Sequence, residues 1–195
     1  AAGRLQDMSI GIECLLADEV RAVELAEHLD ALNNERKEIE TDMLELALAH
    51  LKQLSLDEET AAGLCFYRPD WHQGVVGIVA SRIKEKSHRP VIAFAPAGGG
   101  ELKGSGRSVA GFHLRDALDA IATRHPGLLL KFGGHAMAAG LSLFEADYER
   151  FREAFDQEVR RTLGEARIEQ VVMSDGAMAE PVTVQLAKEI ERAAP

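Results

Sequence analysis

Residues 64–95 read LCFYRPDWHQGVVGIVASRIKEKSHRPVIAFA, and this stretch decides the fold. Its two ends, Leu64–Tyr67 and Val91–Ala95, are apolar runs of strand length. Between them, residues 71–87 have the length and spacing of a helix, with Asp70 as its capping residue. A strand, a helix and a second strand of these lengths predict a right-handed βαβ unit with parallel strands. The sequence therefore predicts an α/β fold.

The segments around this unit extend it into a mixed sheet with flanking helices. Residues 18–54 lack Pro and Gly and carry apolar residues three, four or seven positions apart, which predicts a long amphipathic helix. We interpret it as a connecting helix that stands largely outside the α/β domain; the alternative is a dimerising coiled coil. Further elements are expected beyond the unit: helices at 114–123 and 146–163, strands at 128–132 and 141–144, and a tail with a strand at 168–173 and a helix at 182–193.

The overall composition excludes several classes of protein. Of the 195 residues, 46% are hydrophobic and 28% are charged, as in a folded chain of one or two domains. Mean hydropathy is −0.11 and no apolar run is long enough for a membrane span, so no membrane association is expected. The start, AAGRLQDMSI, does not resemble a signal peptide and suggests a piece of a longer protein. Cys14 and Cys65 lack the spacing of a disulfide framework or a thiolate metal site, which favours a cytoplasmic location.

The charge is distributed unevenly along the chain. The net charge is −10, which taken alone argues against nucleic acid. Residues 64–144, however, carry 10 Lys and Arg against 5 Asp and Glu, and five of the seven histidines. An isolated basic block inside an acidic chain predicts a ligand that bears phosphate.

The motif Lys-Gly-Ser-Gly-Arg-Ser at residues 103–108 is the strongest local indication of chemistry. It combines the cations Lys103 and Arg107 with the hydroxyls of Ser105 and Ser108, on a backbone where glycines such as Gly106 allow close approach. Successive free N–H groups can bind an anion, and a guanidinium matches phosphate. The alternative is a hairpin turn with solvated charges. Neither a P-loop nor a dinucleotide-binding fingerprint fits the spacing.

A second glycine-rich motif, GGHAMAAG, occupies residues 133–140. Gly133 and Gly134 precede His135, and the small residues that follow suggest the start of a short helix, whose N-terminus would attract an anion. The imidazole could contact a phosphate oxygen or a leaving oxygen. The alternative is a packing motif in which His135 is a partly buried polar residue.

The sequence offers no metal site of its own. It contains no HxH, HExxH, Asp cluster or Cys/His spacing of the kinds that bind metals. If the chain belongs to a phosphodiesterase, the metal centre must therefore lie elsewhere. Trp71 could stack on a base, but a single Trp near a helix start is more often a core residue, and we expect a core role.

Three stretches together resemble the DHH-associated domain of the RecJ family of single-stranded-DNA exonucleases. They are WHQGVVGIVASRIKEKSHRPVIAF, GELKGSGRSVAGFHLRDAL and FGGHAMAAGLSL. GGHxxAAG marks the wider DHH phosphoesterase superfamily, whereas GSGRS together with the tryptophan-containing helix points to the RecJ family. The resemblance implies four parts: 1–17 ends the DHH catalytic domain, 18–63 forms connecting helices, 64–165 is the DHH-associated substrate-binding domain, and 166–195 begins an OB-like domain.

The resemblance implies a 5′-to-3′ exonuclease acting on single-stranded DNA in repair and recombination. Its Mn²⁺ or Mg²⁺ pair would bind to residues outside this chain, so we expect no hydrolysis by the chain alone. Ser105, Arg107 and Ser108 would hold DNA phosphates, and Arg4 would reach the same cleft. We expect a monomer, with single-stranded-DNA-binding protein as a candidate partner.

The second motif would face the scissile phosphate through Gly133, Gly134 and His135, with His135 as an auxiliary catalytic group. We therefore expect the two motifs to meet in space, with Arg107 and His135 pointing into one cleft. DNA binding should be weak and salt-sensitive, with the acidic helix turned away. Two other functions stay open: a related phosphodiesterase acting on short RNA or cyclic dinucleotides, and a binding module without turnover.

Overall fold

The computed structural model describes residues 2–54, 61–164 and 183–193. Its helices and strands follow one another as α1 (Ser9–Leu16), α2 (Glu19–Leu54), β1 (Leu64–Tyr67), α3 (Val76–Ser87), β2 (Val91–Gly98), β3 (Glu101–Arg107), α4 (Leu114–Arg124), β4 (Lys131–Gly134), β5 (Ala138–Phe144), the 3₁₀ turn η1 (Glu145–Asp147), α5 (Tyr148–Leu163) and α6 (Val184–Ala193). Within the described residues, no helix is both long and apolar enough to cross a membrane.

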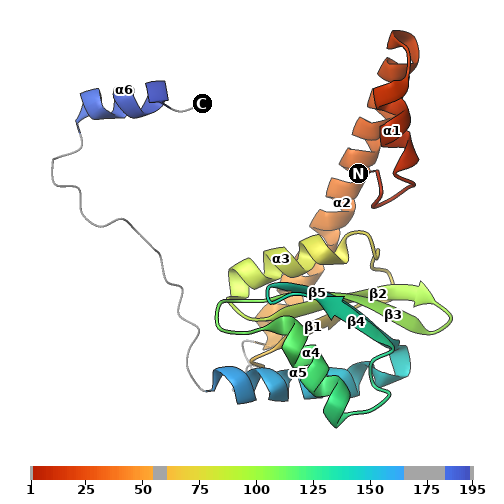
Figure 1. Ribbon diagram of the computed structural model, residues 1–195, viewed down its shortest axis with the longest axis vertical. Coiled ribbons are helices and arrows are strands. Elements are labelled where there is room, and N and C mark those ends of the chain that lie inside the picture. The colour runs from red at the N-terminus through yellow and green to blue at the C-terminus, as the bar shows by residue number, and fades with distance from the viewer. Residues whose placement is uncertain (1, 55–60, 165–182, 194–195) are drawn as a thin grey trace.

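The strands form one mixed sheet in the order β1-β2-β3-β5-β4 (Figure 1). β1 and β2 are parallel, with Leu64 opposite Val91 and Tyr67 opposite Phe94, and α3 connects them. The other pairs, β2–β3, β3–β5 and β5–β4, are antiparallel. The predicted βαβ unit and the mixed α/β class are therefore confirmed.

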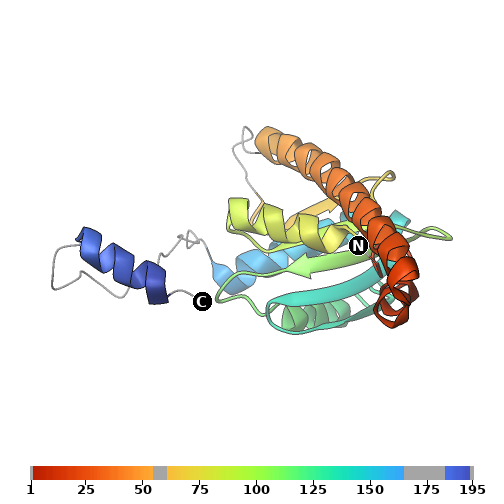
Figure 2. The ribbon, with the colours of Figure 1, turned by 90° about the horizontal axis from the view of Figure 1, so that it is seen from above.

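Helices cover the sheet on two sides. α3 lies on one face, and α4 and α5 lie on the other (Figures 1 and 2). β2 shows both layers, because Ala93 packs with the α3 cluster while Ile92 and Phe94 pack with the α4 and α5 cluster, and all three are fully buried. A strand buried on both faces needs a continuous apolar run, which is why residues 91–95 do not alternate in polarity.

The long helix α2 is present as predicted, but its second half belongs to the domain. Met43 and Ala47 are 3% and 1% exposed and pack in the same cluster as α3. The expectation of a helix that stands outside the domain is therefore wrong for this half. The first half of α2 packs with the short helix α1, on which Leu15 and Leu16 stay exposed.

The helix that follows β1 begins later than predicted. α3 starts at Val76, and its N-cap position is Val75, which provides no side-chain cap; both carboxylate oxygens of Asp70 accept hydrogen bonds from Arg68. The chain then turns through Gly74, whose N–H donates to Nδ1 of His72 at 3.1 Å. Asp70 is therefore not the cap of this helix. Trp71 is 5% exposed, which confirms its predicted place in the core.

The motif at 133–140 forms a hairpin rather than the start of a helix. It is the turn between β4 and β5, in which Gly134 faces Ala139 and the His135 N–H donates to the Ala138 carbonyl at 2.8 Å. The expectation of an anion-binding helix N-terminus here is wrong. In the tail, α6 agrees with the predicted helix, whereas the strand expected at 168–173 lies outside the described residues.

Candidate nucleic-acid interface

The first glycine-rich motif lies on β3, the middle strand of the sheet. β3 pairs with β2 along one edge and with β5 along the other, so its N–H groups donate hydrogen bonds to these two neighbouring strands. The predicted nest of free N–H groups is therefore absent from 103–107. What the motif offers to a ligand is its side chains.

The glycines of β3 face the core rather than a ligand. A Cβ added to Gly104 would lie 2.5 Å from Cε1 of Phe94, and one added to Gly106 would lie 2.6 Å from Cδ2 of Leu114. Real Cβ atoms do not approach so closely, so both positions need glycine for packing. The expectation that these glycines let a ligand approach the backbone is wrong.

The residues that alternate with these glycines face the α3 side of the sheet. Arg107 and Ser105 lie against the first turn of α3, since a Cβ on Gly77 would be 3.0 Å from Nη2 of Arg107 and 3.1 Å from Oγ of Ser105. Lys103 is exposed on the same face, two residues before Ser105.

Small residues continue this face beyond α3. Ser105 lies opposite Gly140 and Arg107 opposite Ala138, and Gly140 in turn lies opposite Gly133. Directly opposite residues share a face. Gly133 and Gly140 are exposed, and a Cβ on Gly133 would meet nothing within 4 Å. We call this uncovered face the open shelf; it consists of Lys103, Lys131, Gly133, Ala138 and Gly140, and Ser105 and Arg107 lie beside it at its border with α3.

Arg107 is held in a fixed orientation at the edge of α3. Its Nε donates to Oγ of Ser81 at 3.1 Å, and its Nη1 donates to Oγ of Ser105 at 3.1 Å and to the Gly106 carbonyl at 2.8 Å. Partial burial, followed by the nearby charge of Arg4, lowers the pKa of Arg107. Two guanidinium groups therefore repel each other here.

Arg4 reaches this point from the N-terminal segment. Its Nη1 donates to the Gly74 carbonyl at 3.2 Å, and any Cβ on Gly74 would collide with the Arg4 backbone. Neither Arg4 nor Arg107 has an ion-pair partner within residues 2–54, 61–164 and 183–193. The uncapped N-terminus of α3, with its partial positive charge, lies beside them. Two unpaired cations at a helix N-terminus are suited to bind an anion with two or more oxygens.

Ser108 does not fit its predicted role. It is 1% exposed, and its hydroxyl donates to the Phe112 carbonyl at 2.6 Å. Its N–H donates to the Met137 carbonyl, which ties the end of β3 to the β4–β5 turn. Ser108 therefore supports the loop and is not available to a phosphate.

His135 lies in the exposed β4–β5 turn, next to the end of β3. Its Nδ1 accepts the Met137 N–H at 3.3 Å, which leaves Nε2 for other contacts. The two motifs do meet, because Arg107 is paired with Ala138, whose carbonyl accepts the His135 N–H. Whether the two side chains share one ligand, and the roles of Gly133, Gly134 and His135, stay predictions.

Only some of the other cations of the basic block share the face of the shelf: Lys131 is exposed on it, because it lies opposite Ser142, which in turn lies opposite Lys103. Arg115 and Arg124 are on α4, on the opposite side of the sheet. Arg115 lies 5.4 Å from the centre of the Phe132 ring, and Arg124 pairs with Glu158 at 2.6 Å. The basic block of residues 64–144 is therefore divided between the two sides of the sheet and does not form a single basic face.

Sequence reasoning missed three residues on or just before α3. Gly74 and Gly77 make room for the Arg4 backbone and for Arg107, and Ser81 accepts a hydrogen bond from Arg107. Gly77 and Ser81 are four residues apart and share one face of the helix. That spacing of small residues within 74–81 could have indicated a face in close contact with another element.

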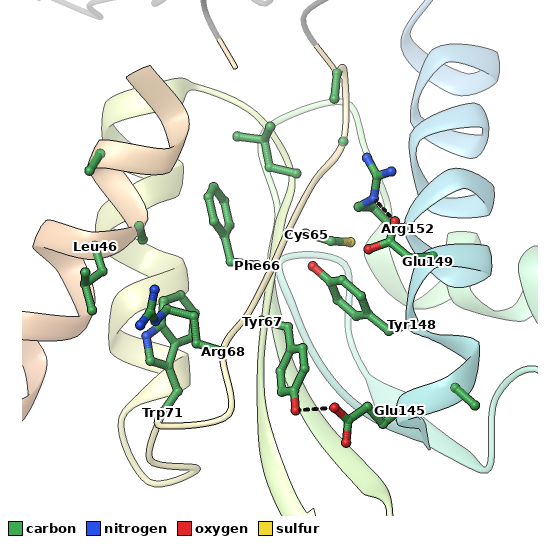
Figure 3. A pocket seen from close by; sticks show the side chains of 16 residues that line it. Leu46, Cys65, Phe66, Tyr67, Arg68, Trp71, Glu145, Tyr148, Glu149 and Arg152 are labelled. Carbon is green, nitrogen blue, oxygen red and sulfur yellow. Dashed lines mark hydrogen bonds and ion pairs between the residues drawn. The ribbon is translucent and has the colours of Figure 1, made fainter. Parts of the chain in front are cut away.

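A pocket lies elsewhere, along the outer edge of β1 between α2 and α5 (Figure 3). It has a volume of about 850 Å³. The Tyr67 hydroxyl donates to Glu145 at 2.8 Å, and Arg152 pairs with Glu149 at 2.7 Å. Burial and then Glu145 raise the pKa of Tyr67 to about 12. Because Glu145 and Glu149 already bind the Tyr67 hydroxyl and the Arg152 guanidinium, this pocket does not suit phosphate.

Comparison with known proteins identifies the family. A sequence model of the DHHA1 domain matches residues 60–161. The chain belongs to the DHHA1 domain family. Among curated relatives, the single-stranded-DNA-specific exonuclease RecJ of Dickeya dadantii is 57% identical and that of Escherichia coli 52% identical, each over the whole chain. The chain spans 34% of the length of both relatives.

Solved structures of RecJ proteins are also similar to this DHHA1 chain. RecJ from Thermus thermophilus in complex with Mn²⁺ has a TM-score of 0.69 and 34% identity over 82% of this chain, which corresponds to 22% of that chain. An exonuclease RecJ bound to manganese has a TM-score of 0.68 and 33% identity, over 86% of this chain and 40% of that chain. In the part of the DHHA1 chain that the structure describes, no three His, Cys, Asp or Glu side chains gather into a metal-binding group.

Proposed function

We propose that this DHHA1 chain is the nucleic-acid-binding part of a metal-dependent 5′-to-3′ single-stranded-DNA exonuclease. The observation that carries the proposal is the pair Arg4 and Arg107, two close guanidinium groups without described ion-pair partners, beside the open shelf. A phosphate between them would relieve their repulsion and accept hydrogen bonds from Nη2 of Arg107, which no described residue accepts. The small residues of the open shelf leave room for a nucleic-acid strand.

The relatives support the rest of the proposal. They are named as single-stranded-DNA-specific exonucleases, and the similar structures contain Mg²⁺ or Mn²⁺. The described residues do not form a ligand set for such ions, so we derive no catalytic step through a metal here. We propose that the metal site belongs to another part of the full-length protein, and that this chain alone does not hydrolyse DNA.

The cellular setting is part of the same proposal. We propose a role in DNA repair and recombination, in the cytoplasm, as a monomer with single-stranded-DNA-binding protein as a partner. Cys14 and Cys65 are free thiols, which fits a reducing compartment.

The test is a binding titration of this chain with a fluorescent single-stranded oligonucleotide at low salt. Arg107→Ala should weaken binding by about tenfold or more, because each hydrogen bond from a charged group contributes about 1.5–3 kcal/mol. Arg150→Ala is the matched control, since Arg150 is an exposed arginine on α5, away from the shelf. Equal affinities of the two variants would contradict the proposal.

A further inference from the structure

The donors of Arg107 are unequally committed. A guanidinium has five N–H donors. Nε and Nη1 are used by Ser81, Ser105 and the Gly106 carbonyl. No described residue accepts a hydrogen bond from Nη2, which lies over the position where Gly77 lacks a Cβ. The acceptors that hold Nε and Nη1 therefore determine the direction in which Nη2 points.

The acceptors that hold Arg107 are all neutral. They are two hydroxyls and one carbonyl, so the guanidinium keeps its full charge for a ligand. A carboxylate in the same place would hold the group equally well but neutralise it. Ser105 and the Gly106 carbonyl lie on Arg107's own strand, whereas Ser81 reaches it from α3.

We propose that Ser81 is a positioning residue, which aims Nη2 of Arg107 at a nucleic-acid phosphate without neutralising its charge. The inference rests on the proposed function of Arg107 and adds Ser81 to it. Its hydroxyl is the acceptor for Nε, and together with the two acceptors for Nη1 it restrains the rotation of the guanidinium plane. Ser81 need not touch the ligand itself.

The experiment compares variants of this chain in titrations with a single-stranded oligo(dT) that carries a 5′-phosphate. Ser81→Ala should weaken binding about tenfold, equivalent to about 1.4 kcal/mol. Ser81→Thr keeps the hydroxyl and should stay within about twofold of the parent, a change of under about 0.5 kcal/mol. Ser81→Asp should bind more weakly than Ser81→Ala, because it adds an anion. Ser87→Ala, at the far end of α3, is the control.

A second readout separates positioning from general stability. The NMR signal of the Arg107 Nε–H group should move and exchange faster with water in Ser81→Ala, and should be restored in Ser81→Thr. If Arg107→Ala weakens binding while Ser81→Ala does not, the inference about Ser81 is overturned and the proposed function stands. If neither weakens binding, the proposed function fails. If Ser81→Asp binds as well as the parent, a neutral acceptor is not required and the inference is wrong.

Discussion

Replacing Gly77 by Ala should weaken the phosphate site of the protein even though alanine is the better helix former. Gly77 lies in the first turn of α3, and its φ is not in the left-handed region. Alanine favours a helix over glycine by about 0.5–1 kcal/mol, but this gain in the free energy of unfolding is opposed by the loss of the hydrogen bonds that hold Arg107. Gly77→Ala should therefore raise Tm by less than the roughly 1–4 °C that helix propensity alone would give for a chain of this size.

The same methyl group crowds the site. It would lie 3.0 Å from Nη2 of Arg107 and 3.1 Å from Oγ of Ser105, whereas comfortable contacts begin near 3.5 Å. Arg107 must move by about 0.5 Å, which lengthens its 3.1 Å bonds to Ser81 and Ser105 beyond useful range. We expect oligonucleotide binding to fall about tenfold, or about 1.4 kcal/mol.

The assay combines thermal unfolding with a binding titration of Gly77→Ala and Gly11→Ala. Gly11 lies on α1, where a Cβ would only reach Ala2 at 3.9 Å, so its replacement should raise Tm without affecting binding. A Gly77→Ala protein that binds as tightly as the parent would refute the account of how Arg107 is held.

Three further predictions concern charge and pH. If Arg4, Arg107 and Lys103 contact three phosphates, the logarithm of the binding constant should fall with log salt with a slope of about −2; a slope near zero would exclude ionic contacts. The chain has two tyrosines, and burial raises the pKa of both, so absorbance of the folded protein should show no ionisation near pH 10, with Tyr67 first at about 12. Hydrogen bonds from Arg161 and then Arg124 lower the pKa of the buried Glu158, so it stabilises the fold at neutral pH, and this stabilisation is lost as the pH falls. Glu158→Gln should therefore lower Tm by several degrees at pH 7 and by less in acid; an equal loss at both would contradict this.

The strands and helices with strong local patterns were predictable from the sequence. β1, α3 and β2 follow from apolar runs and helical spacing, and the parallel pairing follows from their order. The start of α3 was not predictable, because residues 71–75 form turns through hydrogen bonds to His72, and Asp70 pairs with Arg68 instead of capping a helix.

The glycine-rich segments were harder to interpret. Glycines at 104 and 106 suggest a loop, yet they lie in a central strand because Phe94 and Leu114 occupy the space of their missing side chains. The sequence shows polar residues, Lys103, Ser105 and Arg107, in alternation with small or apolar residues. Which face of the strand is exposed, however, depends on where α3 packs on the sheet. The binding motifs were therefore recognisable, while Ser81 and Gly77 required the packing of α3 on β3.

The central claim is that phosphate binds at Arg107 beside the open shelf. The most direct measurement is an NMR titration of the isotope-labelled chain with a short 5′-phosphorylated single-stranded oligonucleotide. We predict the largest changes at Arg107 Nε–H and at the amides of Gly77, Gly133 and Gly140. Changes confined to α4 and α5, or to the pocket along β1, would contradict the claim.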